Sequence, residues 1–229
     1  MKIQELKKSG NYMADIQWLK EHLVCRLINR KNNEKLLKYI PYRKFYDLAV
    51  ICYVPTKKIE DRMYFGIIRN EQMEALGLDE ESLFLLALEN TRKLFPVRFT
   101  ALEQVIRQVA FDAGIDVGKG REENFQMEQE AGEMYILSNT SAIYGAVAMI
   151  YPNVWEAIAN KLQSDLFILP SSCHEVLVLP HTEQWSVLEL ADTVFTINRD
   201  CVEPKDRLSD SVYLYRRAEK KITMAWDAE

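Results

Sequence analysis

Apolar residues are most densely clustered in the central part of the chain, where short apolar runs alternate with turn-forming residues. Four such runs predict strands of a central sheet, at residues 134–137, 144–150, 166–169 and 176–179. Because the runs are continuously apolar, at least part of this sheet is expected to be covered on both faces. Gly145, inside the second run, indicates either a bulge or a close approach of backbone.

One helix is predicted between the second and third of these strands. Apolar residues recur there at helical spacing at Val154, Ile158 and Leu162. Asn153 precedes this stripe and Glu156 follows three residues later, which is the spacing of a capping box. Residues 134–180 therefore predict a strand–strand–helix–strand–strand unit.

The part of the chain before this unit predicts helices on either side of a hairpin. Residues 11–30 carry an apolar stripe at helical spacing and predict one amphipathic helix, and residues 33–39 predict a short second helix. Two runs of strand-forming residues, at 45–54 and 63–68, are separated by a polar turn and predict an antiparallel hairpin.

Three helices are predicted to follow the first hairpin, at residues 70–76, 80–91 and 101–111. Gly77 is expected to end the first of them, and Asp79 is expected to cap the second. The residues of the third helix that are predicted to face inward are Leu102, Val105, Ile106 and Val109.

After the central unit, Thr182 is expected to cap a helix at residues 183–198, and residues 211–217 and 220–226 predict a terminal hairpin. That hairpin can add to the central sheet or form its edge. The complete pattern predicts an α+β fold in which antiparallel hairpins are covered by helices.

One stretch, residues 113–133, is rich in charge and glycine and poor in large apolar side chains. It predicts a linker or a mobile surface loop. Residues 1–112 would then form an N-terminal half of helices and a hairpin, and residues 134–229 a C-terminal half with the core sheet. The alternative is a single domain over residues 10–226.

Composition narrows the classes of function. The net charge of −5 disfavours general nucleic-acid binding, which needs a basic surface. The amino-terminal residues lack the apolar stretch of a signal peptide, and no apolar run is long enough to span a membrane. The four cysteines form no C-x-x-C pair, so a cytoplasmic protein with free, buried thiols is expected.

The candidate catalytic residues lie together at one predicted corner between two strands: Ser171, Ser172, Cys173, His174 and Glu175. A nucleophile needs a base within hydrogen-bond reach. Adjacent residues on a strand point to opposite faces, so His174 could serve Ser171 or Cys173 only if the turn folds back. The alternative is a polar turn whose hydroxyls bond backbone groups.

No metal site and no cofactor are predicted. The three histidines, His22, His174 and His181, share no metal-ligand spacing with one another. The glycines at residues 114, 118 and 120 do not follow an apolar strand, so they do not predict a phosphate-binding loop.

Several blocks of sequence together carry a family resemblance. They are IPYRKFYDLAVICYV, LFLLALENTRKLFP, MYILSN, IYGAVAMIYP, ILPSSCHEVLVLP and LSDSVYLY. In this order, over most of residues 10–217, the chain resembles an uncharacterised family of bacterial proteins with only a domain-of-unknown-function label. The family is common in gut Clostridia and often lies near mobile elements. The resemblance implies a cytoplasmic protein of a Gram-positive anaerobe, and it brings no activity, cofactor or catalytic residue.

Two hypotheses of function follow from the sequence. The first is a non-catalytic protein-interaction or regulatory module with a protein partner, because no catalytic or cofactor motif is found and the chain is acidic and rich in aromatic residues. The second is a metal-independent hydrolase or transferase that uses the corner from Ser171 to Glu175.

Overall fold

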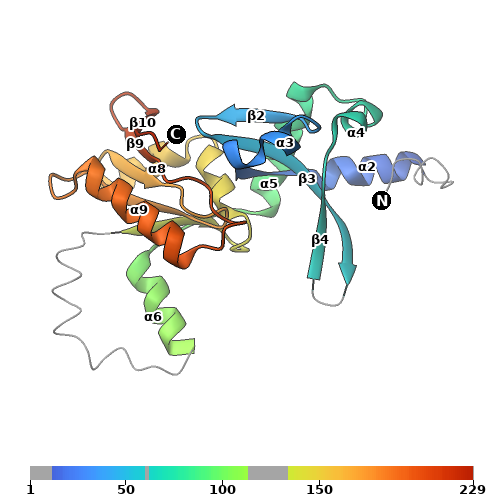
Figure 1. Ribbon diagram of the computed structural model, residues 1–229. Coiled ribbons are helices and arrows are strands. Elements are labelled where there is room, and N and C mark those ends of the chain that lie inside the picture. The colour runs from blue at the N-terminus through green and yellow to red at the C-terminus, as the bar shows by residue number, and fades with distance from the viewer. Residues whose placement is uncertain (1–11, 60–61, 113–133, 229) are drawn as a thin grey trace. The chain divides into compact units, whose positions relative to one another are not determined.

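The computed structural model describes residues 12–59, 62–112 and 134–228. The chain divides into two compact units, Met1–Pro96 and Val97–Glu229. The linker or loop expected at residues 113–133 lies outside the described residues. The described helices and antiparallel sheets confirm the predicted α+β class (Figure 1).

The first unit contains an antiparallel sheet. Its strands are β1 (Val24–Asn29), β2 (Tyr42–Phe45), β3 (Leu48–Ile59) and β4 (Arg62–Ile67). β3 lies between β1 and β2, and its second half pairs with β4. The β3–β4 pair is the hairpin that the sequence predicts.

Among the described residues of the first unit, the helical segments are α2 (Tyr12–His22), η1 (Lys31–Asn33), α3 (Glu34–Leu37), α4 (Asn70–Ala75) and α5 (Glu80–Leu94). The capping prediction for α5 is confirmed, since the Asp79 carboxylate accepts a hydrogen bond from the Ser82 backbone N–H. Gly77 has the left-handed φ of 66° that favours glycine after a helix.

The single helix predicted over residues 11–30 is wrong in its second half. α2 ends at His22, and the chain continues as β1. The Asn90 side-chain amide of α5 donates hydrogen bonds to the Lys20 and Leu23 carbonyls, which satisfies acceptors at this helix end. The next residues then pair with β3, and this non-local pairing overrides the apolar spacing that continues the helical pattern.

The second unit is built on a six-stranded antiparallel sheet with the order β10-β9-β7-β8-β6-β5. The strands are β5 (Val97–Ala101), β6 (Tyr135–Asn139), β7 (Leu166–Leu169), β8 (Val176–Pro180), β9 (Val212–Arg216) and β10 (Lys221–Trp226). The terminal hairpin is confirmed. β9 joins the sheet beside β7, and β10 forms one edge.

Both faces of this sheet are covered at its centre, as the continuous apolar runs predict. On one face, Leu190 and Val194 of α9 (Val187–Cys201) pack into a buried cluster with alternate residues of β7, β8 and β9. On the other face, Trp155 of α8 (Val154–Leu162) lies against Tyr215, with ring centroids 6.5 Å apart. Every residue of β7 is consequently buried.

The strand predicted at residues 144–150 is wrong, so the unit does not run strand–strand–helix–strand–strand. β6 is followed by a 3-10 helix, η3 (Gly145–Ile150), and then by α8. The run is apolar because η3 is buried from Gly145 to Met149, and burial makes helix and strand segments look alike in sequence. The Asn153 side chain makes no capping hydrogen bond, although the residue stands at the N-cap of α8.

Two helices of the second unit differ from their predictions in detail. α9 begins at Val187, with Ser186 and Glu189 in a capping box, and is not capped by Thr182. α6 (Leu102–Asp112) follows the edge strand β5, which the sequence did not predict. Ile106 and Val109 of α6 are exposed, against the prediction that they face inward.

Candidate functional site

The candidate catalytic residues lie in the connection between β7 and β8, beside the loop that leads from α9 to β9. Backbone hydrogen bonds join these two segments: Cys173 N–H donates to the Asp206 carbonyl at 2.7 Å, and Leu208 N–H donates to the Ser171 carbonyl at 2.9 Å. A bridge between Ser172 and Arg207 lies between these contacts. The α9–β9 loop is therefore fixed against the corner, and it brings in a carboxylate distant in sequence.

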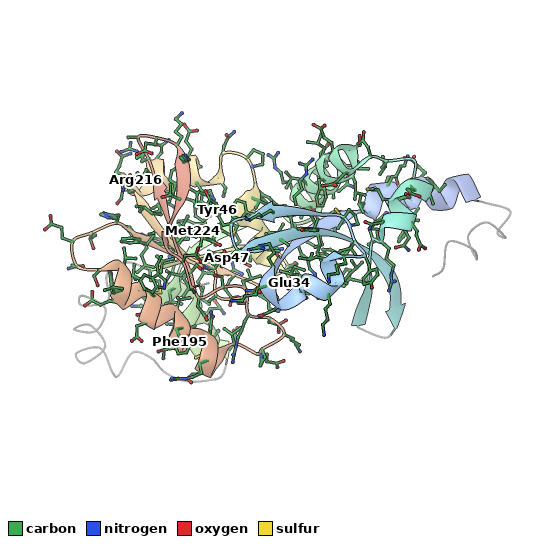
Figure 2. The ribbon with its side chains drawn as sticks, turned by 45° about the horizontal axis from the view of Figure 1, so that its top comes forward. Glu34, Tyr46, Asp47, Phe195, Arg216 and Met224 are labelled. Atoms are coloured by element: carbon green, nitrogen blue, oxygen red, sulfur yellow. The ribbon has the colours of Figure 1, made fainter. Side chains whose placement is uncertain are left out.

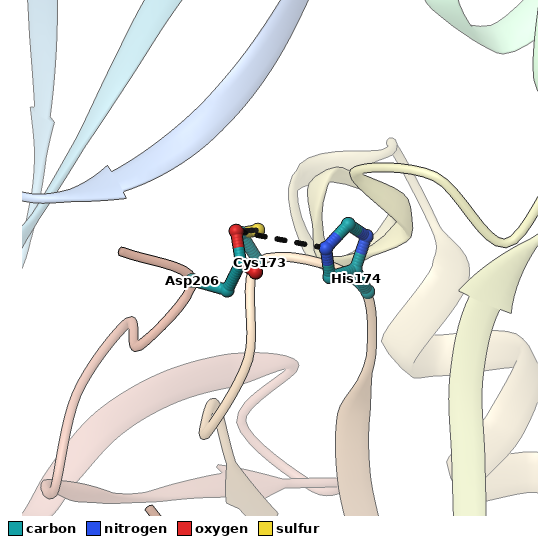
Figure 3. Close-up of side chains that lie close together, drawn as sticks. All are labelled: Cys173, His174 and Asp206. Atoms are coloured by element: carbon teal, nitrogen blue, oxygen red, sulfur yellow. Dashed lines mark hydrogen bonds and ion pairs between the residues drawn. The ribbon is translucent and has the colours of Figure 1, made fainter. Parts of the chain in front are cut away.

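Three side chains meet at this corner (Figure 3). The Cys173 thiol donates to Asp206 Oδ1 at 3.5 Å, and His174 Nε2 lies 3.7 Å from the same oxygen. The ligand atoms of the three residues all lie within 4.8 Å of one another. Cys173 is buried, while His174 and Asp206 are partly exposed, so solvent reaches one side of the cluster.

The imidazole of His174 is held on its other side by Tyr144. The Tyr144 backbone N–H donates to His174 Nδ1 at 3.3 Å, and the two rings stack with centroids 5.7 Å apart. Since Nδ1 accepts this hydrogen bond, the proton of a neutral ring is assigned to Nε2. A single bond of this kind stabilises the folded state by about 0.5–1.5 kcal/mol net.

The remaining predicted residues are not brought into the cluster. The Ser172 hydroxyl accepts a hydrogen bond from the His174 backbone N–H at 3.0 Å. Ser171 is buried and makes backbone contacts with Leu208 and Leu169. Glu175 is half-buried directly before β8.

Gly145 packs directly against the backbone of the corner at His174. The Ser138 hydroxyl donates to the His174 carbonyl at 2.8 Å. A Cβ on Gly145 would lie 2.1 Å from Ser138 Oγ and 2.5 Å from the His174 carbonyl oxygen. Only glycine allows η3 to start here, so the predicted close approach of backbone at Gly145 is confirmed.

The arrangement limits what the corner can do chemically. A cysteine becomes a strong nucleophile when a base or a positive charge stabilises its thiolate. Here the Cys173 thiol faces the Asp206 carboxylate, and His174 Nε2 carries a proton in the assigned tautomer. A thiol, an imidazole and a carboxylate are, however, three of the side-chain types that bind zinc.

Comparison with known proteins shows which family the chain belongs to. A family model described as a family of unknown function, DUF5688, matches residues 2–217. The chain belongs to this family. No curated protein and no solved structure matches the chain. Membership therefore supports the resemblance found in the sequence, and it assigns no chemistry to the corner.

The position of Asp206 was missed by sequence reasoning, as was that of Tyr144. Asp206 lies in the polar segment EPKDR, which carries no local signal of a site. The backbone pairing of residues 171–173 with residues 206–208 places it beside Cys173.

Within the residues that the structure describes, no helix is both long and apolar enough to cross a membrane.

Proposed function

We propose that the protein is a non-catalytic protein-interaction module that binds its partner through one face of α6. That face, the α6 stripe, consists of Leu102, Val105, Ile106 and Val109. The exposed fractions of Ile106 and Val109 are 54% and 62%. Ile106 and Val109 are exposed on the same side of α6, and this is the observation that carries the proposal, because exposed apolar surface marks interaction sites.

The polar side of α6 supports this assignment. Arg107 forms an ion pair with Glu103, and the Gln108 amide donates to Asp112 at 2.9 Å. These side chains bond along their own helix, so they do not need an external partner. The α6 stripe, about 100° wide at helical spacing, is the part of the helix that gains most from being covered.

The expected partner is a protein with an apolar groove, and not a second copy of this chain. The 11 residues of α6 span only about 16 Å. Two such stripes packed against each other cannot supply the roughly 800 Å² per partner of a stable interface. A groove that surrounds the helix on more than one side buries more surface per residue, and recognises apolar residues at this spacing.

The corner at β7–β8 also favours a non-catalytic role. The ring of His174 accepts a backbone N–H, and the Ser172 hydroxyl accepts another. Groups that satisfy the backbone in this way stabilise a turn, and they are then less able to accept a proton from a substrate or a nucleophile.

Photocrosslinking of the full chain in cells that naturally express it tests the proposal. A benzoylphenylalanine replaces Ile106 in one variant and Leu188, which is 63% exposed on α9, in the control. The expected result is an adduct with a different protein at Ile106 and not at Leu188. Adducts only with a second copy, only with the chain itself, or with nothing, would overturn it.

The captured protein is then identified by mass spectrometry and purified. Ile106→Asp is expected to weaken its binding at least tenfold, while Leu188→Asp leaves it unchanged. Equal binding by both variants would show that the α6 stripe is not the contact surface.

A second candidate function is a metal-independent hydrolase or transferase at the corner from Ser171 to Glu175. The observation in its favour is that Asp206 joins Cys173 and His174, as a third member joins a nucleophile and its base. The tautomer of His174 counts against it. Turnover of activated esters or thioesters by the chain, lost in Cys173→Ala, would favour this function over the first.

A further inference from the structure

The geometry at the β7–β8 corner matches that of a metal centre more closely than that of a catalytic dyad. Cys173 Sγ lies 3.5 Å from Asp206 Oδ1, and His174 Nε2 lies 3.7 Å from the same atom. Tetrahedral zinc, with bonds of about 2.0–2.3 Å, separates its ligand atoms by about 3.4–3.6 Å. All three atoms fall within 4.8 Å of one another, so the widest pair has to close by about 1.2–1.4 Å at most.

The backbone already holds the ligands in place. The Cys173 N–H donates to the Asp206 carbonyl at 2.7 Å, and the Cys173 carbonyl accepts from Ala146 N–H at 3.3 Å. Ser138 fixes the His174 carbonyl from β6. Three different segments therefore position the cluster, and little further ordering is needed when an ion binds.

The site also has an open side. The side chains of His174 and Asp206 are 33% and 21% exposed, whereas Cys173 is buried below them. An ion can enter from solvent, and a water can take the fourth position. Three protein ligands with an open fourth position are typical of zinc sites that keep a water molecule.

We propose that Cys173, His174 and Asp206 bind a thiophilic divalent cation, Zn²⁺. On binding, the Cys173 thiol loses its proton to solvent and the thiolate sulfur bonds the metal. The His174 proton moves from Nε2 to Nδ1, so that Nε2 donates its lone pair and the ring stays neutral. The proposal is independent of the α6 stripe.

The hydrogen bond between Tyr144 and His174 disfavours binding of the ion. The Tyr144 backbone N–H points at His174 Nδ1 and would face the relocated proton. This contact is long, at 3.3 Å, and is a single hydrogen bond set against three metal–ligand bonds. A small rotation of the imidazole relieves it, and the partly exposed ring has solvent on one side to rotate into.

Cobalt titration of the full, tag-free chain tests the site, after dialysis against a chelator. Co²⁺ substitutes for Zn²⁺ and gives a thiolate-to-cobalt charge-transfer band in the near ultraviolet when cysteine is a ligand. The expected result is a band that saturates at one Co²⁺ per chain, is reversed by Zn²⁺, and accompanies release of about one proton per ion at neutral pH.

Three variants locate the ion. Cys173→Ser is expected to abolish the band, Asp206→Asn to weaken Co²⁺ binding at least tenfold, and Cys201→Ser to change nothing, because Cys201 is an exposed thiol at the end of α9. Asp206→Asn keeps the thiol, so it remains informative if Cys173→Ser does not fold. No band in the wild type, a band lost in Cys201→Ser, or equal affinity in Asp206→Asn would overturn the proposal.

Discussion

The helices α9 and α6 lie in the same unit and are both amphipathic, yet only one of them buries its apolar stripe. Leu190 and Val194 of α9 are fully buried between the helix and the central strands of the sheet. The corresponding residues of α6, Ile106 and Val109, are more than half exposed. α9 connects β8 and β9, which both lie inside the sheet, whereas α6 follows β5, which forms an edge of the sheet.

The difference shows what an apolar stripe establishes and what it does not. Spacing identifies which face of a helix is apolar, because that depends only on 3.6 residues per turn. It does not identify the surface that covers the face. In α9 that surface is the sheet of the same chain, and for α6 we propose that it belongs to another protein. Substitutions on the two helices measure this difference directly.

The largest effect is expected on α9. Leu190→Ala removes a fully buried side chain from the cluster between helix and sheet, and should lower the free energy of unfolding by about 2–5 kcal/mol. Leu188→Ala is the matched control, since Leu188 lies two residues away and is exposed. Urea denaturation of both variants measures the effect, and similar losses for both would contradict the packing described.

A smaller effect is expected at the start of α9. The Ser186 hydroxyl accepts the Glu189 backbone N–H, and the Glu189 carboxylate accepts from the Ser186 backbone and hydroxyl. Ser186→Ala removes both interactions of the hydroxyl and should lower the free energy of unfolding by about 0.5–2 kcal/mol. Thr182→Ala, at the cap that the sequence predicted, should change the free energy of unfolding much less.

The same cap should respond to pH. Hydrogen bonds from the Ser186 side chain and backbone lower the pKa of Glu189. A carboxyl group whose pKa is lowered in the folded state stabilises that state. This stabilisation is present above the unfolded pKa and is lost as pH falls through the folded pKa. Ser186→Ala should therefore lower the free energy of unfolding less at about pH 3 than at pH 7. An equal decrease at both pH values would mean that the Glu189 carboxylate is not part of the cap.

The smallest effect is expected on α6. Ile106→Ala removes an exposed side chain and replaces a β-branched residue with the best helix former, so the free energy of unfolding should change by less than about 0.5 kcal/mol. The same substitution should still weaken partner binding. A loss of several kcal/mol in urea denaturation of the isolated chain would show that the α6 stripe is covered within the molecule.

Local sequence predicted most elements of the fold, and it failed where distant residues decide the structure. β1 continues the apolar spacing of α2, and it becomes a strand because β3 offers it a partner. η3 has the composition of a strand, and it is a 3-10 helix because Gly145 has to reach the backbone of His174. Neither Asn90, which bonds the end of α2, nor Ser138 is near in sequence to the group it contacts.

The candidate site was predictable only in part, for the same reason. The side chains of Cys173 and His174 attract attention because thiol and imidazole are adjacent in sequence. Asp206 and Tyr144 determine what those groups can do, and each lies about thirty residues away. Their contribution depends on two loops that come together only when the sheet is complete.

The strand order of the second unit also has a consequence for biosynthesis. β7 lies between β8 and β9, and β6 pairs with β8 across about forty residues of chain. During translation, β7 is completed before β8 and β9 exist, and after β8 has been made this entirely apolar strand still has one unpaired edge. Strand pairing between residues so far apart in sequence also slows folding, since a long loop has to close before the stabilising contacts form. The nascent chain is therefore most prone to aggregation between the synthesis of β7 and that of β9.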